Sequence, residues 1–151
     1  MRLAVVGSRD FPGLGRIDAY LDCVNGDLGL ELDCIISDGA RGVDSRAEGW
    51  AMRNGIALVS FRPEKASVSG GGRWEVRRAV WPSRSKQYDK AVVTVLPGSY
   101  PTFAAAAFVR NRFIADFSDA VVAFWDGKSR GTKDTIAKAR SLGNLRDIIR
   151  G

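Results

Sequence analysis

The chain has 151 residues, the usual length of one domain, and 45% of them are hydrophobic, which is enough for a sizeable core. Its formal net charge is +6, and it has no histidine and only two cysteines. This composition excludes nucleophilic triads that use histidine, and a zinc site is not expected. No run of 18 apolar residues occurs, so we expect no membrane partner.

The cysteines and the N-terminus predict the cellular location. Cys23 and Cys34 do not form a Cys-x-x-Cys pair, which favours reduced thiols in the cytoplasm. The chain begins directly with an apolar strand pattern and lacks the layout of a signal peptide. We therefore expect a cytoplasmic protein, without a metal or a cofactor.

Short apolar runs alternate with helical periodicity along the chain. Strands are predicted at residues 3–6, 34–37, 57–61, 91–96 and 120–124, and helices at 17–24, 44–54, 102–116 and 131–142. Residues 73–81 are compatible with one short helix, and residues 144–151 with a single helical turn. The alternation predicts an α/β protein in which residues 1–151 form a single Rossmann-like three-layer domain with a mainly parallel sheet.

The first predicted strand ends in Gly7, Ser8 and Arg9. In open α/β sheets, ligands bind at the carboxyl ends of strands. Gly7 allows close approach of the backbone, Ser8 can donate to a phosphate, and Arg9 can form a bidentate contact with one. The alternative is an ordinary strand-to-helix turn with an exposed arginine.

A second glycine loop follows the strand at 34–37. Its candidate ligand contacts are Gly39, Ala40, Arg41, Gly42 and Asp44. Asp44 stands at the start of a predicted helix. A carboxylate there either caps the helix or accepts a hydrogen bond from a ribose hydroxyl or the loop backbone.

A third loop, residues 125–132, joins the buried strand at 120–124 to the last predicted helix. The free N–H groups and the positive dipole end of that helix favour an anion. The candidate phosphate contacts are Ser129, Arg130, Gly131 and Thr132. We expect a phosphorylated, nucleotide-like ligand at this loop.

The positive charge is concentrated in residues 62–90. This segment has eight basic and three acidic residues, so it carries five of the six net positive charges. Such a segment suits a polyanion, which makes nucleic acid a candidate partner through Arg62 to Lys90. The alternatives are a lid over the domain and a solvated basic loop.

The three loops, together with Arg110 and Asn111, resemble the YspA-related branch of the SLOG superfamily over nearly the whole chain. That superfamily also contains the Lonely Guy phosphoribohydrolases and the DNA-processing protein A family. The resemblance implies a Rossmann-like fold whose strand-end loops bind nucleotides or their derivatives. It also implies that Arg110 supplies charge and that Asn111 orients the ligand.

Two departures from these relatives bear on function. Asp38 stands where the branch usually has glycine, and a carboxylate would repel a phosphate, so this loop is expected to contact ribose or base. The glutamate of the phosphoribohydrolases corresponds to Thr135, and Asp134 is rotated from it by about 100° on a helix. If the protein is an enzyme, Asp134 and Asp126 are the candidate catalytic carboxylates.

We expect the chain to bind a nucleotide or nucleotide-derived small molecule as a sensor or binding module. The first alternative is N-glycosidic hydrolysis of nucleoside 5′-monophosphates, and the second is binding of single-stranded DNA. Relatives often pair through helices, so a homodimer is compatible with this interpretation. The sequence leaves the identity of the ligand, turnover and the oligomeric state open.

Overall fold

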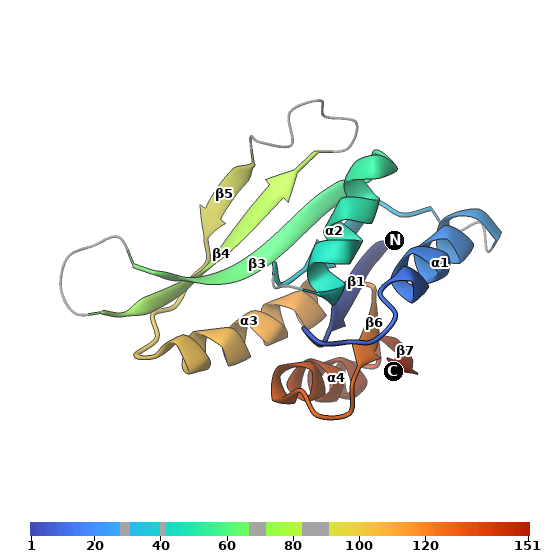
Figure 1. Ribbon diagram of the computed structural model, residues 1–151. Helices are drawn as coiled ribbons and strands as arrows, with labels where there is room; N and C mark the ends of the chain where they lie inside the picture. The colour runs from blue at the N-terminus through green and yellow to red at the C-terminus, as the bar shows by residue number, and fades with distance from the viewer. Residues whose placement is uncertain (28–30, 40–41, 67–71, 83–90) are drawn as a thin grey trace.

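The computed structural model describes residues 1–27, 31–39, 42–66, 72–82 and 91–151 (Figure 1). The elements are β1 (Arg2–Gly7), α1 (Gly15–Asp22), the π-helical segment η1 (Cys23–Asp27), β2 (Cys34–Ser37), α2 (Val43–Arg53), β3 (Ala57–Lys65), β4 (Trp74–Trp81), β5 (Val92–Val95), α3 (Phe103–Phe117), β6 (Ala120–Trp125), α4 (Arg130–Leu142) and β7 (Leu145–Arg150). Among these described residues, no helix is long and apolar enough to cross a membrane.

The seven strands form one sheet in the order β5-β4-β3-β2-β1-β6-β7. The strands from β3 to β7 in this order are parallel, whereas β4 runs antiparallel to β3 and β5 antiparallel to β4. The predicted α/β class with a mainly parallel sheet is confirmed. The chain builds outward from β1 to β3 on one side and then places β6 and β7 on the other. The strand order therefore reverses between β1 and β6, the place where open α/β sheets bind ligands.

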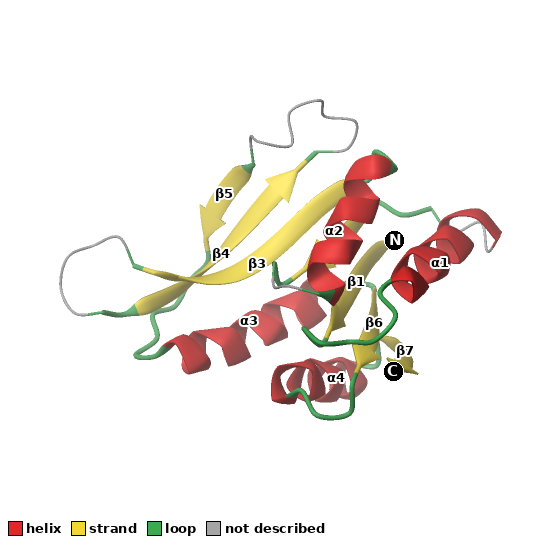
Figure 2. Ribbon diagram, viewed as in Figure 1, coloured by secondary structure: helices red, strands yellow, loops and turns green. Residues whose placement is uncertain are grey.

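Helices cover both faces of the sheet, so the fold has three layers (Figure 2). Successive residues of β1 face opposite sides. Leu3 and Val5 belong to the core that contains buried residues of α1 and α2. Ala4 and Val6 belong to the core that contains buried residues of α3 and α4. Burial on both faces explains why the central strands read as continuous apolar runs.

Two sequence predictions of local structure are wrong. Residues 73–81 were expected to be helical, but β4 pairs along its whole length with β3, from Trp81 opposite Leu58 to Trp74 opposite Lys65. Residues 144–151 contain the edge strand β7 and no helical turn. In both segments, pairing with a distant strand decides the structure, and local helical spacing does not.

The basic segment 62–90 is largely an extension of the sheet. β3 continues four residues past the predicted end at Phe61 and includes Arg62 and Lys65. Arg77 and Arg78 lie in β4. Arg73 directly precedes β4, and the remaining basic residues Arg84, Lys86 and Lys90 lie outside the described residues. The predicted lid or loop is therefore described only in part, and the described part is a strand pair.

Candidate functional site

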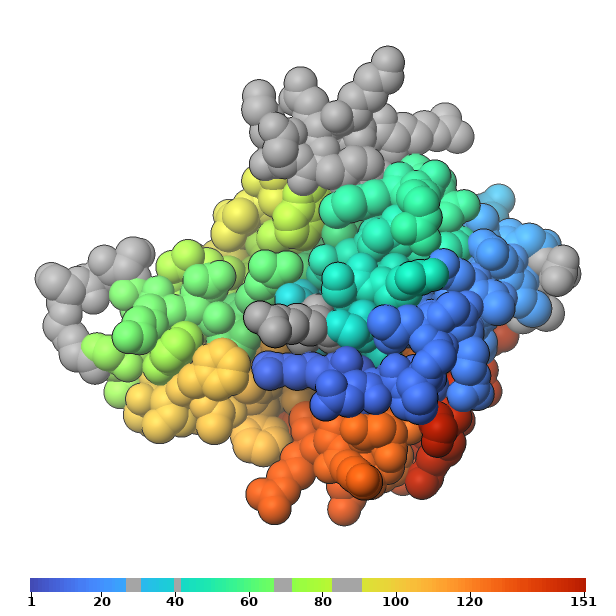
Figure 3. All heavy atoms as spheres, viewed as in Figure 1, coloured from blue at the N-terminus to red at the C-terminus, as the bar shows by residue number. Residues whose placement is uncertain are grey.

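A cavity of about 670 Å³ lies at the carboxyl ends of the parallel strands, at the point where the strand order reverses. Its volume falls within the usual range for small-molecule sites. In Figure 3 the blue loop after β1 runs between the teal α2 and the orange α4 on this face of the molecule. The cavity is lined by Gly7, Arg9, Asp10, Asp38, Gly39, Arg62, Pro63, Phe103, Arg110, Asn111, Asp126, Lys128, Ser129, Gly131 and Thr132.

Of the candidate side chains in the loop after β1, Arg9 lines the cavity and Ser8 stabilises the loop. Arg9 is exposed and lines the cavity. Ser8 is buried, and its hydroxyl accepts a hydrogen bond from the backbone N–H of Asp126 at 3.1 Å. Gly7 lines the cavity but is also required by packing, because a Cβ there would lie 2.5 Å from the carbonyl oxygen of Phe124.

The loop after β2 brings Asp38 and Gly39 to the cavity wall. Gly39 has a φ of +72°, and a Cβ there would lie 2.0 Å from Nε of Arg62. The arginine side chain therefore lies directly over the glycine. Arg62 is also 3.8 Å from Glu48. The predicted contacts Ala40 and Arg41 lie outside the described residues.

Gly42 and Asp44 do not line this cavity. Gly42 has a φ of +76°, and a Cβ there would lie 2.5 Å from the carbonyl oxygen of Arg9, so this glycine lets two loops touch. Asp44 is fully buried, and its Oδ1 accepts a hydrogen bond from the backbone N–H of Asp38 at 3.0 Å. Burial and then the neighbouring Asp38 carboxyl raise the pKa of Asp44 well above its ordinary value, and Arg110 opposes this shift. Asp44 therefore stabilises the backbone of the loop after β2 from the interior of the protein.

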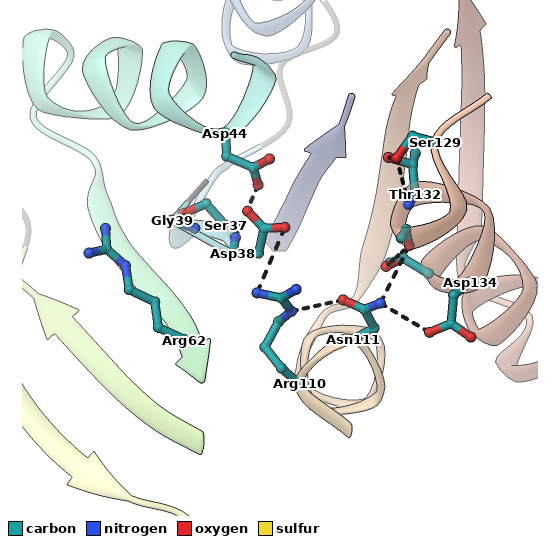
Figure 4. Close-up of polar contacts among 12 residues, drawn as sticks. Ser37, Asp38, Gly39, Asp44, Arg62, Arg110, Asn111, Ser129, Thr132 and Asp134 are labelled. Carbon is teal, nitrogen blue, oxygen red and sulfur yellow. Dashed lines mark hydrogen bonds and ion pairs between the residues drawn. The ribbon is translucent and has the colours of Figure 1, made fainter. Parts of the chain in front are cut away.

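Arg110 and Asn111 of α3 belong to a polar chain across the floor of the site (Figure 4). The Arg110 side chain is only 12% exposed and lies 3.9 Å from the Asp38 carboxylate. Its Nε donates to Oδ1 of Asn111 at 2.8 Å. Nδ2 of Asn111 donates to Asp134 at 3.0 Å and to the carbonyl of Gly131 at 3.4 Å. The chain thus links the β2 loop to α4.

The loop after β6 is shaped by Asp126. Its Oδ1 accepts hydrogen bonds from the N–H groups of Lys128 and Ser129, both at 2.8 Å. These two backbone donors, that of Ser129 first, lower the pKa of Asp126. Ser129 caps α4 by accepting from the N–H of Thr132 at 3.3 Å. A carboxylate held ionised by its own loop suits a structural role, although Asp126 also lines the cavity.

Two of the sequence candidates on α4 lie away from the cavity. Arg130 is exposed but is not among the lining residues. Asp134 is also absent from the lining, and its carboxylate pairs with Asn111 and with Lys138. Neither residue is presented directly to a molecule bound in the cavity.

Sequence reasoning missed six lining residues as ligand contacts: Asp10, Asp38, Arg62, Pro63, Phe103 and Lys128. Asp10 and Lys128 lie inside the predicted loops, so their positions alone could have suggested them. Arg62 and Pro63 were missed because β3 continues past the carboxyl end of β2 and forms a wall of the cavity. Phe103 starts α3 and is 50% exposed.

Positive side chains outnumber negative ones around the cavity. Arg9, Arg62, Arg110 and Lys128 face three aspartates in the lining. Within the part of the chain that the structure describes, no ion pair involves Arg9 or Lys128. No cluster of three or more potential metal ligands occurs among these same residues. The cavity is therefore polar, and its lining has a small excess of cationic side chains.

The fold and this site define a class of protein, a Rossmann-like domain with a strand-end binding cavity. Residues 1–68 match the model of the YspA, cpYpsA-related SLOG family, which confirms the resemblance predicted from the sequence. The comparison with curated proteins finds no match.

Two solved structures of DNA processing protein A are similar to the chain over nearly its full length. The Streptococcus pneumoniae protein has 25% sequence identity and a TM-score of 0.61, covering 99% of this chain and 49% of that protein. The Helicobacter pylori protein, whose single-stranded DNA binding mode was described, has 17% identity and a TM-score of 0.63. That second match covers 97% of this chain and 64% of the other. The chain thus spans about half to two thirds of these proteins, and the second likeness concerns the fold alone.

Proposed function

We propose that the cavity binds the phosphate of a nucleotide or nucleotide-derived small molecule, and that the protein acts as a sensor or binding module. The strongest support is the convergence of Arg9, Lys128 and the amino end of α4 on one cavity at the reversal of strand order. Ligands of open α/β folds bind at this topological position.

The amino end of α4 offers backbone donors. In its first turn, the N–H of Thr132 donates to Ser129, whereas those of Arg130 and Gly131 have no acceptor among the described residues. The dipole of this 13-residue helix adds positive potential at the same end. A phosphate there receives hydrogen bonds and charge together, and Arg9 and Lys128 add mobile cations.

The rest of the cavity suits the remainder of a nucleotide. Phe103 presents a half-exposed ring in the wall, which can stack against a base. The Asp38 carboxylate and the remaining lone pair of Oδ1 of Asn111 supply acceptors for hydroxyl or base atoms. An inorganic anion alone would leave most of the cavity unfilled.

Mass spectrometry of small molecules released from the purified, denatured protein is the first test. Calorimetric titration with AMP, GMP, CMP and UMP follows, and we expect at least one to bind with a dissociation constant in the micromolar range. Free base released from the same nucleotides would report hydrolysis. If neither these nucleotides nor inorganic phosphate binds at millimolar concentration, the proposed function is wrong.

Single-stranded DNA is a second candidate ligand, favoured by the similarity to DNA processing protein A. The Helicobacter pylori protein of that name binds single-stranded DNA. In the basic strand pair of this chain, however, Arg77 is paired with Glu75 at 2.7 Å, and Arg78 lies over the ring of Phe117. Fluorescence anisotropy with labelled oligo(dT) across a salt series tests this candidate. Affinity that falls steeply with salt supports it, and weak binding that does not change with salt contradicts it.

A further inference from the structure

We propose, on the basis of the nucleotide site argued above, that Asp38 accepts a hydrogen bond from the 2′-hydroxyl of a ribose and makes the site selective for ribonucleotides over deoxyribonucleotides. The residue directly follows β2, the strand next to β1, and its side chain lines the cavity.

The surroundings of Asp38 hold it in a fixed position. Its backbone N–H donates to the buried Asp44 at 3.0 Å, and its carboxylate lies 3.9 Å from Arg110. The side chain is 18% exposed, so it reaches the cavity without extending into solvent. Gly39, which follows it, lies under Arg62. A carboxylate held in this way is preorganised for one donor position.

Charge repulsion keeps the phosphate of the ligand away from the Asp38 carboxylate. An ionised carboxylate only accepts hydrogen bonds, so it repels a phosphate and attracts hydroxyl groups. It accepts up to about four hydrogen bonds, so its contacts with Arg110 and with the Asp44 carboxyl are compatible with contact to a hydroxyl. The ligand is therefore oriented with its phosphate away from Asp38.

The spacing between Asp38 and α4 fits this orientation. β2 and β6 are separated by β1, and adjacent strands lie about 4.8 Å apart, so the two ends are roughly 10 Å apart. Figure 4 places Asp38 on one side of the site and Ser129 with Thr132 on the other. A phosphate at the amino end of α4 and a sugar hydroxyl at Asp38 therefore lie on opposite sides of the cavity.

A 2′-deoxy sugar removes one donor. The selectivity of Asp38 therefore favours ribonucleotides, and it disfavours DNA as a ligand of this cavity. A ribonucleotide would gain a hydrogen bond to Asp38, whereas single-stranded DNA, which lacks the 2′-hydroxyl, would not.

The experiment compares matched pairs, AMP with 2′-dAMP and GMP with 2′-dGMP, by calorimetry on the full chain. We expect the ribonucleotide of a pair to bind roughly ten- to hundredfold more tightly, the effect of one charge-assisted hydrogen bond. In Asp38→Ala this ratio should fall to near one. Asp116→Ala, which removes an exposed carboxylate of α3 outside the lining, should keep the wild-type ratio. Because the ratio is taken within each variant, it does not depend on the fraction of folded protein.

Each other outcome has a defined meaning. Equal binding of both sugars by the wild type overturns the inference and leaves the nucleotide site standing. A ribose preference that survives in Asp38→Ala shows that another residue selects the sugar, and it also overturns the inference. Absence of binding by all four mononucleotides contradicts the proposed nucleotide site itself, and the inference falls with it.

Discussion

The hydroxyl of Ser8 accepts a hydrogen bond from the backbone N–H of Asp126, at 3.1 Å, across 118 residues of sequence. This contact ties the carboxyl end of β1 to that of β6, the two strands between which the cavity opens. Ser8 was expected to donate to a phosphate. In the structure it is buried and fixes the loop that carries the other half of the site.

Replacement of Ser8 by alanine should destabilise the protein. The N–H of Asp126 would lose its acceptor, at a cost of roughly 1–2 kcal/mol in the free energy of unfolding. Urea denaturation followed by circular dichroism measures this loss. Ser45→Ala, which changes an exposed serine of α2, is the control and should leave the midpoint unchanged. Equal stability of both variants would show that the Ser8 contact contributes nothing.

Two glycines of the cavity lining should respond in opposite ways to alanine. A Cβ at Gly7 would lie 2.5 Å from a backbone oxygen, so Gly7→Ala should cost roughly 1–3 kcal/mol through overpacking. A Cβ at Gly131 would meet nothing within 4 Å, and alanine is the better helix former by about 1 kcal/mol. Gly131→Ala should therefore keep or raise the melting temperature. Thermal unfolding of the two variants shows whether each glycine is required by packing or instead allows a ligand to approach the backbone.

Asp44 should make stability depend on pH. Its pKa is raised in the folded state, so the native protein binds more protons than the unfolded chain above the ordinary aspartate pKa of about 3.9. The contribution of Asp44 is therefore most favourable at low pH and declines as pH rises above that value. The charged groups that act on the Asp44 carboxyl are Asp38 and Arg110.

The variant Asp44→Asn isolates this effect. Its amide oxygen can still accept from the N–H of Asp38, but it cannot ionise. Urea denaturation from pH 4.5 to 8 should show the variant gaining stability relative to wild type as pH rises. If the difference between the two proteins is constant across this range, Asp44 does not titrate as expected.

Arg9 should contribute to binding and not to the fold. The side chain is exposed and has no ion pair among the described residues. Arg9→Ala should weaken the binding of a mononucleotide by about tenfold or more, the loss of one charge-assisted contact. The melting temperature should not change. Arg140→Ala, at the far end of α4, is the charge-matched control, and equal affinity in the two variants would remove Arg9 from the site.

The two cysteines should differ in reactivity. Burial raises the pKa of the Cys34 thiol to about 11, so almost no thiolate exists there at pH 8. Cys23 is exposed. Iodoacetamide followed by peptide mass spectrometry should label Cys23 in the native protein and Cys34 only after denaturation. Rapid native labelling of Cys34 would contradict its burial.

The parallel part of the sheet could be predicted because each of its central strands is buried on both faces. Cys34–Ser37 was predicted with the observed bounds for this reason. Glycine loops after the strands at 3–6, 34–37 and 120–124 also predicted which edge of the sheet bears the cavity. Local apolar runs and loop composition carry this information without knowledge of distant contacts.

Other features depend on contacts that no local pattern encodes. β4 is a strand because it pairs with β3, although Trp74, Arg77 and Trp81 also share a helical face. Arg62 reaches the cavity because β3 continues beyond the end of β2. Asp44 is a residue type that can contact a ligand, but it is buried behind Asp38. It therefore accepts a hydrogen bond from the backbone of Asp38 and does not reach the cavity.

The close contact between Gly39 and Arg62 has a consequence for how related sequences can diverge. A side chain at position 39 would collide with the guanidinium and would also have to adopt a positive φ. The two positions should therefore change together: a relative with a larger residue at 39 should have a shorter residue at 62. In such a relative, the wall of the cavity would lose one cation, and the preferred charge of its ligand should shift accordingly.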